Sequence, residues 1–197
     1  MTSVSRRDGS EDGGDRLPMW LLDVDGVINS IGRPATGTAH RSVDLVVQEW
    51  PVVVWYQPDI VDRINALHRA GRAHVAWLTT WDHEAADVLA PAIGLDDFPI
   101  VTEPPGTYAK HPGSRLGHTW WKLAAAHAEL ARAPRPALIW TDDEISDDVR
   151  AATKARWPEL PTLMLRPLEM PGLTPEHLDR IEDFLSSIRP GTASEAQ

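Results

Sequence analysis

The chain has 197 residues, carries a formal net charge of −10 and contains no cysteine. This length fits one domain that can bury a hydrophobic core, and the lack of cysteine excludes disulfides, thiol catalysis and cysteine-ligated zinc. The acidic charge disfavours a nucleic-acid binder built on a basic stripe, although a local basic patch is compatible with it. No apolar run approaches the roughly 20 residues that span a bilayer, so no membrane segment is expected. The polar N-terminus lacks the apolar core of a signal peptide, so we expect a cytoplasmic protein.

Apolar runs alternate with helical patterns along most of the chain. Residues 1–16 and 190–197 are polar and are expected to be disordered tails, which leaves one domain over 17–189. Expected strands cover 18–23, 73–78, 99–101, 137–140 and 162–165, and expected helices cover 59–70, 83–92, 118–131, 146–156 and a last segment from Thr174. Nearly all-apolar strands are typical of a parallel sheet covered on both faces, so we predict an α/β fold of three layers.

The segment 29–58 departs from this alternation. It contains two runs rich in β-branched and aromatic residues, 41–48 and 52–56, with Pro51 between them. These runs predict a β-hairpin that forms a small flap over the site. Two readings of Trp55 and Tyr56 stay open, because they can stack on a nucleic-acid base or pin the flap to the core. Arg33, His40 and Arg41 are either phosphate contacts or ordinary loop residues.

Polar residues suited to chemistry follow three of the expected strands. The first strand ends at Asp23-Val-Asp25-Gly26, which places two carboxylates one residue apart. Such a pair needs a cation or a proton to compensate its charge, and Mg²⁺ prefers oxygen ligands of this kind. Gly26 permits a sharp turn that brings backbone N–H groups near an anion. The alternative is an ordinary solvated turn.

Thr79 and Thr80 follow the second strand, where the hydroxyl of Thr79 and the backbone N–H of Thr80 can donate to a phosphoryl oxygen. Lys122, in the helix before the fourth strand, is the candidate that neutralises the phosphate, and Lys110 in a loop competes with it. The alternatives are a helix cap for Thr79 and a surface position on the helix for Lys122.

The fourth strand ends at Asp142 and Asp143, and further acids follow it. Acids this close repel one another unless a cation is near, so we expect Asp142 and Asp143 to bind a metal ion. Glu144 and Asp148 are explained by the favourable interaction of acids with a helix N-terminus.

Taken together and in this order, these motifs resemble the haloacid dehalogenase-like (HAD) phosphohydrolase superfamily over about 17–165. Residues 21–29 (LLDVDGVIN), 77–81 (WLTTW) and 139–144 (IWTDDE) are also similar to HAD domains linked to bacterial RNA-repair (Swiss Army Knife) proteins. The resemblance implies a Rossmann-like sandwich and a Mg²⁺-dependent phosphatase with an aspartyl-phosphate intermediate.

The resemblance also implies a role for each site residue. Asp23 would be the nucleophile, Asp25 the general acid and base, and Thr79 and Lys122 the groups that orient and neutralise the phosphoryl group. Mg²⁺ would be held by Asp23, Asp142, Asp143 and the backbone carbonyl of Asp25. Gly26, Thr80 and Lys110 would contact the substrate.

The sequence has no long insertion that could form a large cap domain. An open site implies a bulky phosphorylated substrate, such as a nucleic-acid end or a phosphoprotein, or closure by a partner. The alternative function is a non-catalytic module that binds phosphate and metal within a nucleic-acid repair or protein complex. The sequence predicts no oligomeric state.

Overall fold

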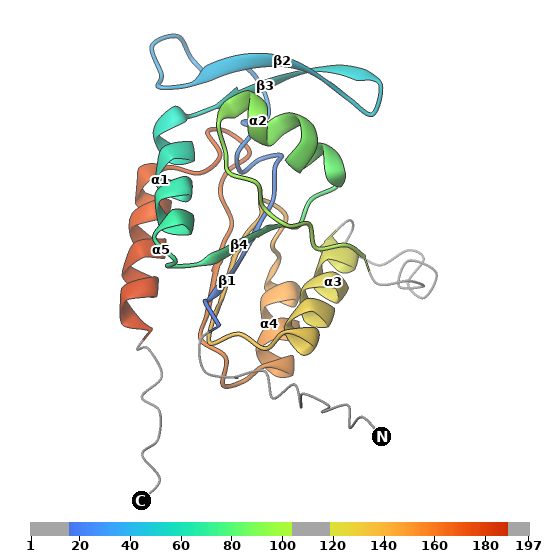
Figure 1. Ribbon diagram of the computed structural model, residues 1–197, viewed down its shortest axis with the longest axis vertical. Coiled ribbons are helices and arrows are strands. Elements are labelled where there is room, and N and C mark those ends of the chain that lie inside the picture. The colour runs from blue at the N-terminus through green and yellow to red at the C-terminus, as the bar shows by residue number, and fades with distance from the viewer. Residues whose placement is uncertain (1–15, 104–118, 189–197) are drawn as a thin grey trace, which may run out of the picture.

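The computed structural model describes residues 16–103 and 119–188 (Figure 1). Its central sheet has four parallel strands in the order β4-β1-β5-β6. The strands are β1 (Met19–Leu22), β4 (His74–Trp77), β5 (Leu138–Thr141) and β6 (Thr162–Leu165). The helical segments are α1 (Pro58–Arg69), η1 (Ala85–Leu89), α2 (Ala90–Ile93), α3 (Thr119–Arg132), α4 (Asp147–Arg156) and α5 (Pro175–Ser187). The predicted α/β class and parallel sheet are confirmed.

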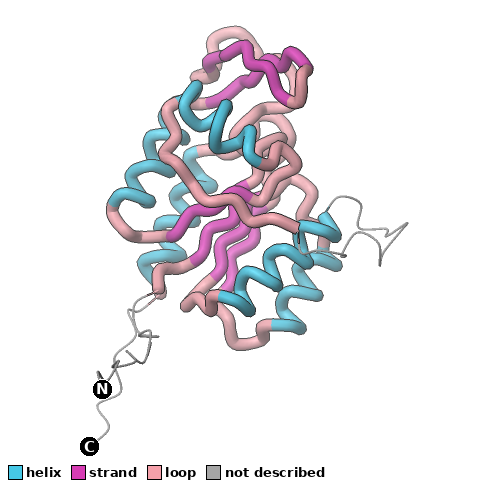
Figure 2. Tube along the Cα trace, turned by 45° about the vertical axis from the view of Figure 1, so that its right-hand side comes forward, coloured by secondary structure: helices cyan, strands magenta, loops and turns pink. Residues whose placement is uncertain are grey.

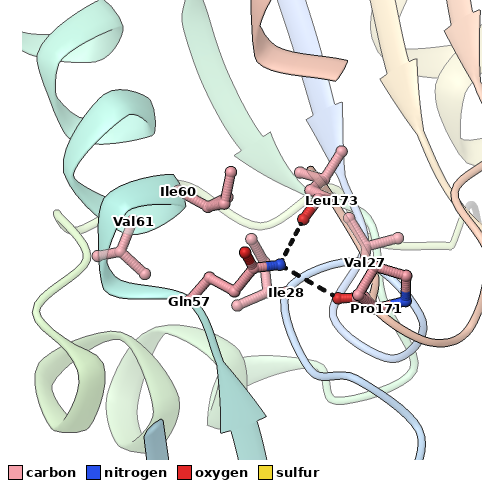
Figure 3. Close-up of a pocket in the computed structure, with 7 residues that line it drawn as sticks. All are labelled: Val27, Ile28, Gln57, Ile60, Val61, Pro171 and Leu173. Carbon is pink, nitrogen blue, oxygen red and sulfur yellow. Dashed lines mark hydrogen bonds between the residues drawn. The ribbon is translucent and has the colours of Figure 1, made fainter. Parts of the chain in front are cut away.

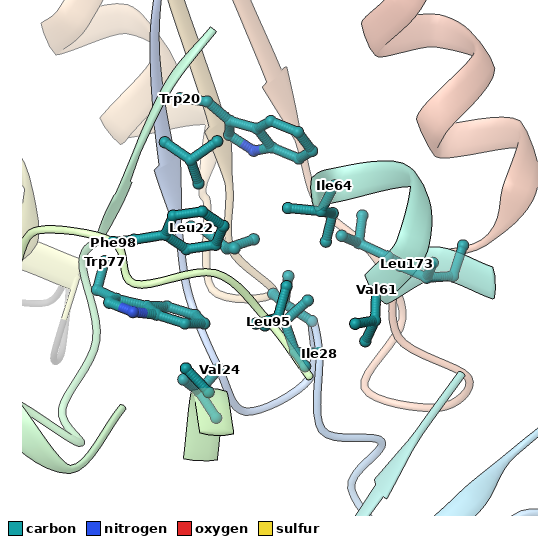
Figure 4. Close-up of a cluster of buried hydrophobic side chains, with 14 of the residues drawn as sticks. Trp20, Leu22, Val24, Ile28, Val61, Ile64, Trp77, Leu95, Phe98 and Leu173 are labelled. Carbon is teal, nitrogen blue, oxygen red and sulfur yellow. The ribbon is translucent and has the colours of Figure 1, made fainter. Parts of the chain in front are cut away.

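Successive residues of a strand point to opposite faces of the sheet. Both faces are apolar here, and helices cover each of them. From β1, Trp20 and Leu22 join a core formed with α1 and α5, whereas Met19 and Leu21 join a second core formed with α3 and α4. Figure 2 shows the sheet between these helix layers, and Figure 4 shows part of the first core around Trp20. This arrangement is compatible with a Rossmann-like sandwich.

Two predicted elements differ in the structure. The strand expected at 99–101 is reduced to one parallel bridge between Trp77 and Ile100 at the edge of the sheet. The helix expected at 83–92 is a π-helical turn, η1, followed by the short helix α2. Pro91 has no N–H to donate, so a regular α-helical ladder cannot continue through it.

The predicted hairpin is present as β2 (Arg41–Val47) and β3 (Trp50–Tyr56), but its turn is not at Pro51. The turn is at Gln48 and Glu49, which both have positive φ, and Pro51 lies within β3 opposite Val46. A two-stranded sheet has two free edges, so a proline that lacks the N–H is tolerated there. Tyr56 packs against the main core, as one of the two readings predicted.

The hairpin is joined to the loop after β6 at its base. Gln57, which follows β3, donates from its side-chain amide to the carbonyl oxygens of Leu173 at 2.9 Å and Pro171 at 3.4 Å (Figure 3). The hairpin thus has a fixed position beside the carboxyl ends of the strands. Within the described ranges, no helix is long and apolar enough to cross a membrane.

Candidate active site

Three carboxylates meet at the carboxyl ends of the two central strands. Asp23 follows β1 and Asp142 follows β5, and these strands pair in register, with Leu22 opposite Thr141. Asp143 is the next residue. One oxygen from each of the three carboxylates lies within 4.8 Å of the other two. The expectation that Asp23, Asp142 and Asp143 come together is therefore confirmed, and the cluster can bind a metal ion.

Lys122 reaches this cluster from α3. Its Nζ donates to Oδ2 of Asp23 at 2.6 Å and to Oδ2 of Asp142 at 2.8 Å. All three side chains are almost completely buried, with exposed fractions of 3% for Lys122, 6% for Asp23 and 0% for Asp142. Burial opposes the charge of the amine, but the two carboxylates together outweigh it and raise the pKa of Lys122. The amine is therefore a permanent cation in the site.

One amine does not balance three carboxylates. Burial, and then the charge of Asp142, raise the pKa of Asp23 to about 7 against the lowering effect of Lys122. Burial, Asp142 and Glu144 likewise raise the pKa of Asp143 to about 6. The formal charge of the three carboxylates and the amine is −2, which a divalent cation would neutralise.

The backbone around the cluster orients the carboxylates further. The N–H of Val24 donates to Oδ1 of Asp23 at 2.8 Å, and the N–H of Glu144 donates to Oδ1 of Asp142 at 2.8 Å. Both oxygens of Asp23 and both oxygens of Asp142 therefore have a donor, which fixes the planes of these two carboxyl groups.

Gly26 is required by the shape of the loop. Its φ is +68°, and a Cβ at this position would lie 2.4 Å from Cγ and Oδ2 of Asp143. The N–H of Gly26 donates to the carbonyl of Asn29 at 2.8 Å. In this structure, Gly26 therefore acts by letting the loop after β1 pass close to Asp143.

The side chain of Asp25 lies outside the three-carboxylate cluster and has its own partners. Its Oδ1 accepts a hydrogen bond from Nδ2 of Asn29 at 2.7 Å, and its Oδ2 accepts one from Nε1 of Trp81 at 2.8 Å. Asp25 as a whole is half-buried. It is held at the site by two donors and is not a side-chain member of the cluster.

Thr79 and Thr80 lie where β4 ends. Thr79 is buried, and its Oγ1 accepts a hydrogen bond from the N–H of Trp81 at 3.3 Å. Thr80 is exposed, and its carbonyl accepts a long hydrogen bond of 3.4 Å from Gln48 of the hairpin turn. Both threonines line a hollow of about 320 Å³, together with Trp121 of α3. Lys110 lies outside the described residues.

Sequence reasoning assigned no role to Asn29 and Trp81, which bind Asp25. These residues end the motifs LLDVDGVIN and WLTTW, so their place beside the site residues is visible in the sequence. Nothing in the residue types showed that their side chains would turn toward Asp25.

Comparison with known protein families, with curated proteins and with solved structures gave no significant match. Any functional assignment therefore depends on the geometry and chemistry of the site itself.

Proposed function

We propose that the chain is a Mg²⁺-dependent phosphomonoesterase of the HAD type that uses Asp23 as its nucleophile. The observation that carries this proposal is the buried cluster of Asp23, Asp142 and Asp143 with Lys122 between two of the acids. A cluster with a formal charge of −2 at the carboxyl ends of a parallel sheet is suited to one divalent cation and one anionic substrate.

The donor set fits Mg²⁺ because all its candidate ligands are oxygens. Asp23, Asp142 and Asp143 would hold the ion, with the backbone carbonyl of Asp25 as a further ligand. The raised pKa of Asp23 supports this fit, because a nucleophilic carboxylate must be ionised and a cation would favour its ionised form. When bound, the ion would shield the repulsion between Asp23 and an anionic phosphoryl group.

In the proposed covalent step, a phosphoryl group moves from the ester oxygen to an oxygen of Asp23. An oxygen of Asp23 forms a bond to phosphorus while the bond from phosphorus to the ester oxygen breaks, which gives an aspartyl-phosphate and the leaving group. Lys122 lies against Asp23 and offsets negative charge on the phosphoryl group. The hydroxyl of Thr79, at the neighbouring strand end, would orient the same group.

Asp25 supplies the proton transfers. In the first step its carboxylic acid gives a proton to the ester oxygen, which leaves as an alcohol. In the second step the Asp25 carboxylate takes a proton from a water molecule that attacks phosphorus. Phosphate is released, and the carboxylate of Asp23 is restored. The sum is one ester and one water converted to one alcohol and one phosphate.

The test is turnover of a panel of phosphate esters, including 5′- and 3′-phosphorylated oligonucleotides, phosphopeptides and small esters, with Mg²⁺ and with EDTA. We expect Mg²⁺-dependent release of phosphate by the wild type. Asp23→Asn should lower kcat by about a thousandfold or more, because it removes the nucleophile while keeping the side-chain volume. The fold of this variant should be retained, as judged by circular dichroism.

The matched control is Asp148→Asn, which makes the same substitution at an exposed acid on α4. It should retain the activity of the wild type. Equal activity of the wild type and Asp23→Asn would show that another group carries the chemistry. Mg²⁺ binding without turnover of any ester would instead favour the non-catalytic module.

A further inference from the structure

The carboxyl group of Asp25 has a defined orientation, because each of its oxygens accepts a hydrogen bond from a different side chain. Asn29 donates at 2.7 Å and Trp81 donates at 2.8 Å. The side chains come from different parts of the fold, since Asn29 lies in the loop after β1 and Trp81 in the loop after β4. Two such contacts fix the plane of a carboxyl group that would otherwise rotate freely.

Both donors are themselves held by the surrounding structure. Asn29 is 7% exposed, and its Oδ1 accepts the N–H of Trp55 in β3 at 3.0 Å. Ser30, the next residue, donates its N–H to the carbonyl of Trp55 at 2.8 Å. Trp81 is 5% exposed, and its backbone N–H donates to the hydroxyl oxygen of Thr79. The orientation of Asp25 thus depends on the hairpin through Asn29 and on the β4 loop through Trp81.

We propose that Asn29 and Trp81 are positioning residues that hold Asp25 in the geometry required to protonate the leaving group. This inference rests on the proposed phosphatase function. A general acid must lie within about 2.6–3.2 Å of the oxygen that it protonates, so its orientation limits its efficiency. Each Asp25 oxygen uses one lone pair to accept from its donor, which leaves a second lone pair. The second lone pair of one oxygen carries the proton that is transferred as the phosphorus–oxygen bond breaks.

The experiment compares two esters that differ in their need for an acid. A dinitrophenyl phosphate has a leaving group that departs as a stable anion, whereas an alkyl phosphate has a leaving group that must be protonated. The measured quantity is kcat/KM, which reports the steps up to the departure of the leaving group and not the later hydrolysis of the phosphoenzyme. A loss of acid positioning therefore affects the alkyl ester selectively.

Trp81→Phe keeps an aromatic ring at this position and removes the N–H donor together with part of the indole volume. We expect its kcat/KM for the alkyl ester to fall by about tenfold or more. The kcat/KM for the dinitrophenyl ester should change by less than about twofold, because only the alkyl leaving group needs the acid. Asn29→Ala should show the same selectivity. It provides an independent test if Trp81→Phe fails to fold.

Trp20→Phe is the matched control. Its indole N–H donates to Oγ1 of Thr141 at 3.1 Å within the core, so this variant also loses one buried indole hydrogen bond. Any effect of Trp20→Phe should be equal for both esters. Equal losses for both esters in Trp81→Phe and Asn29→Ala would overturn the inference and leave the proposed function intact. A wild type without turnover of either ester would overturn both.

Discussion

Lys122 is a buried cation that contacts two of the three clustered carboxylates. Removing its amine would leave Asp23 and Asp142 buried without their common partner. Breaking one side of a buried ion pair is more costly than the pair itself is stabilising, because the remaining charge has lost its solvent and its counter-ion. The amine of Lys122 therefore stabilises the folded state through the same two carboxylates that it holds at the site.

Lys122→Met keeps a side chain of similar length and removes the charge. We expect the free energy of unfolding without Mg²⁺ to fall by about 3–5 kcal/mol, as measured by urea denaturation. Added Mg²⁺ should restore part of this loss, because it supplies positive charge to the same carboxylates. Phosphatase activity should remain strongly reduced, because the ion would not replace the proposed contact of the amine with the phosphoryl group.

The control for this variant is Lys154→Met. Lys154 is exposed on α4, and its amine binds the carbonyl of Pro158. It should change the unfolding free energy by less than about 0.5 kcal/mol, as is usual for surface substitutions. A similar small effect of both variants would show that the buried carboxylates do not depend on the amine of Lys122.

At the scale of elements, apolar strands ending in acids were predictable because burial and strand-end chemistry are local patterns. The prediction that Asp23 and Asp142 lie close together needs only the rule that parallel strands present their carboxyl ends at one edge of the sheet. The sequence leaves Lys122 and Lys110 as competing candidates, because the neighbours of Lys122 on α3 do not show which way its side chain points. The hairpin turn was misplaced because a proline is typical of turns, whereas in this fold Pro51 occupies a strand with a free edge.

The neutral side chain of His177 accepts a hydrogen bond at the start of α5. The N–H of Thr174, the N-cap residue, donates to Nδ1 of His177 at 3.1 Å. Burial, and then the charge of Arg180, lower the pKa of His177 below its ordinary value of 6.5, while Glu176 opposes them. A ring protonated at Nδ1 cannot accept the backbone N–H of Thr174, so protonation breaks this hydrogen bond and leaves only the contact of Nδ1 with Oγ1 of Thr174 at 3.0 Å.

His177→Gln tests this dependence, because glutamine also accepts a hydrogen bond at this helical position and does not titrate. The folded pKa of His177 lies below the unfolded pKa. Its stabilising effect is therefore complete above about pH 6.5 and is lost as the pH falls below it. Between pH 7.5 and pH 5, urea denaturation should show the wild type losing about 1 kcal/mol more stability than the variant.

His83→Gln is the control, since His83 is exposed with a side-chain exposed fraction of 73%. It should follow the pH dependence of the wild type. Parallel curves for the wild type and His177→Gln would show that the cap does not depend on the neutral ring.

At the scale of the whole molecule, the position of the site follows from the order of the strands. The chain runs from β1 outward to β4, then returns across the sheet to β5 on the other side of β1. The connections therefore diverge between β1 and β5, which is where open parallel sheets bind ligands. The hairpin borders this opening, because its contacts with Asn29 and Thr80 place it next to Asp25 and Thr79. A large phosphate ester bound as proposed above would therefore lie next to the hairpin as well as to Asp25.

The cluster links the two halves of the sheet, so an ion bound there should stabilise the entire fold. A ligand present at 100 times its dissociation constant stabilises the native state by about 2.7 kcal/mol. For a chain of this size, that corresponds to an increase of about 5–10 °C in Tm. We expect this shift with MgCl₂ in a thermal unfolding experiment, and we expect NaCl at equal ionic strength not to reproduce it.

The dependence of this shift on Asp143 tests whether the ion binds at the cluster. Asp143→Asn removes the charge of one candidate ligand that is only half-buried, so the variant should fold. Its Tm should respond weakly to MgCl₂, whereas Asp148→Asn, an exposed acid in the same acidic run, should show the full response. Equal shifts in the two variants would place the ion elsewhere. A smaller shift in Asp143→Asn than in Asp148→Asn would support a divalent cation held between β1 and β5.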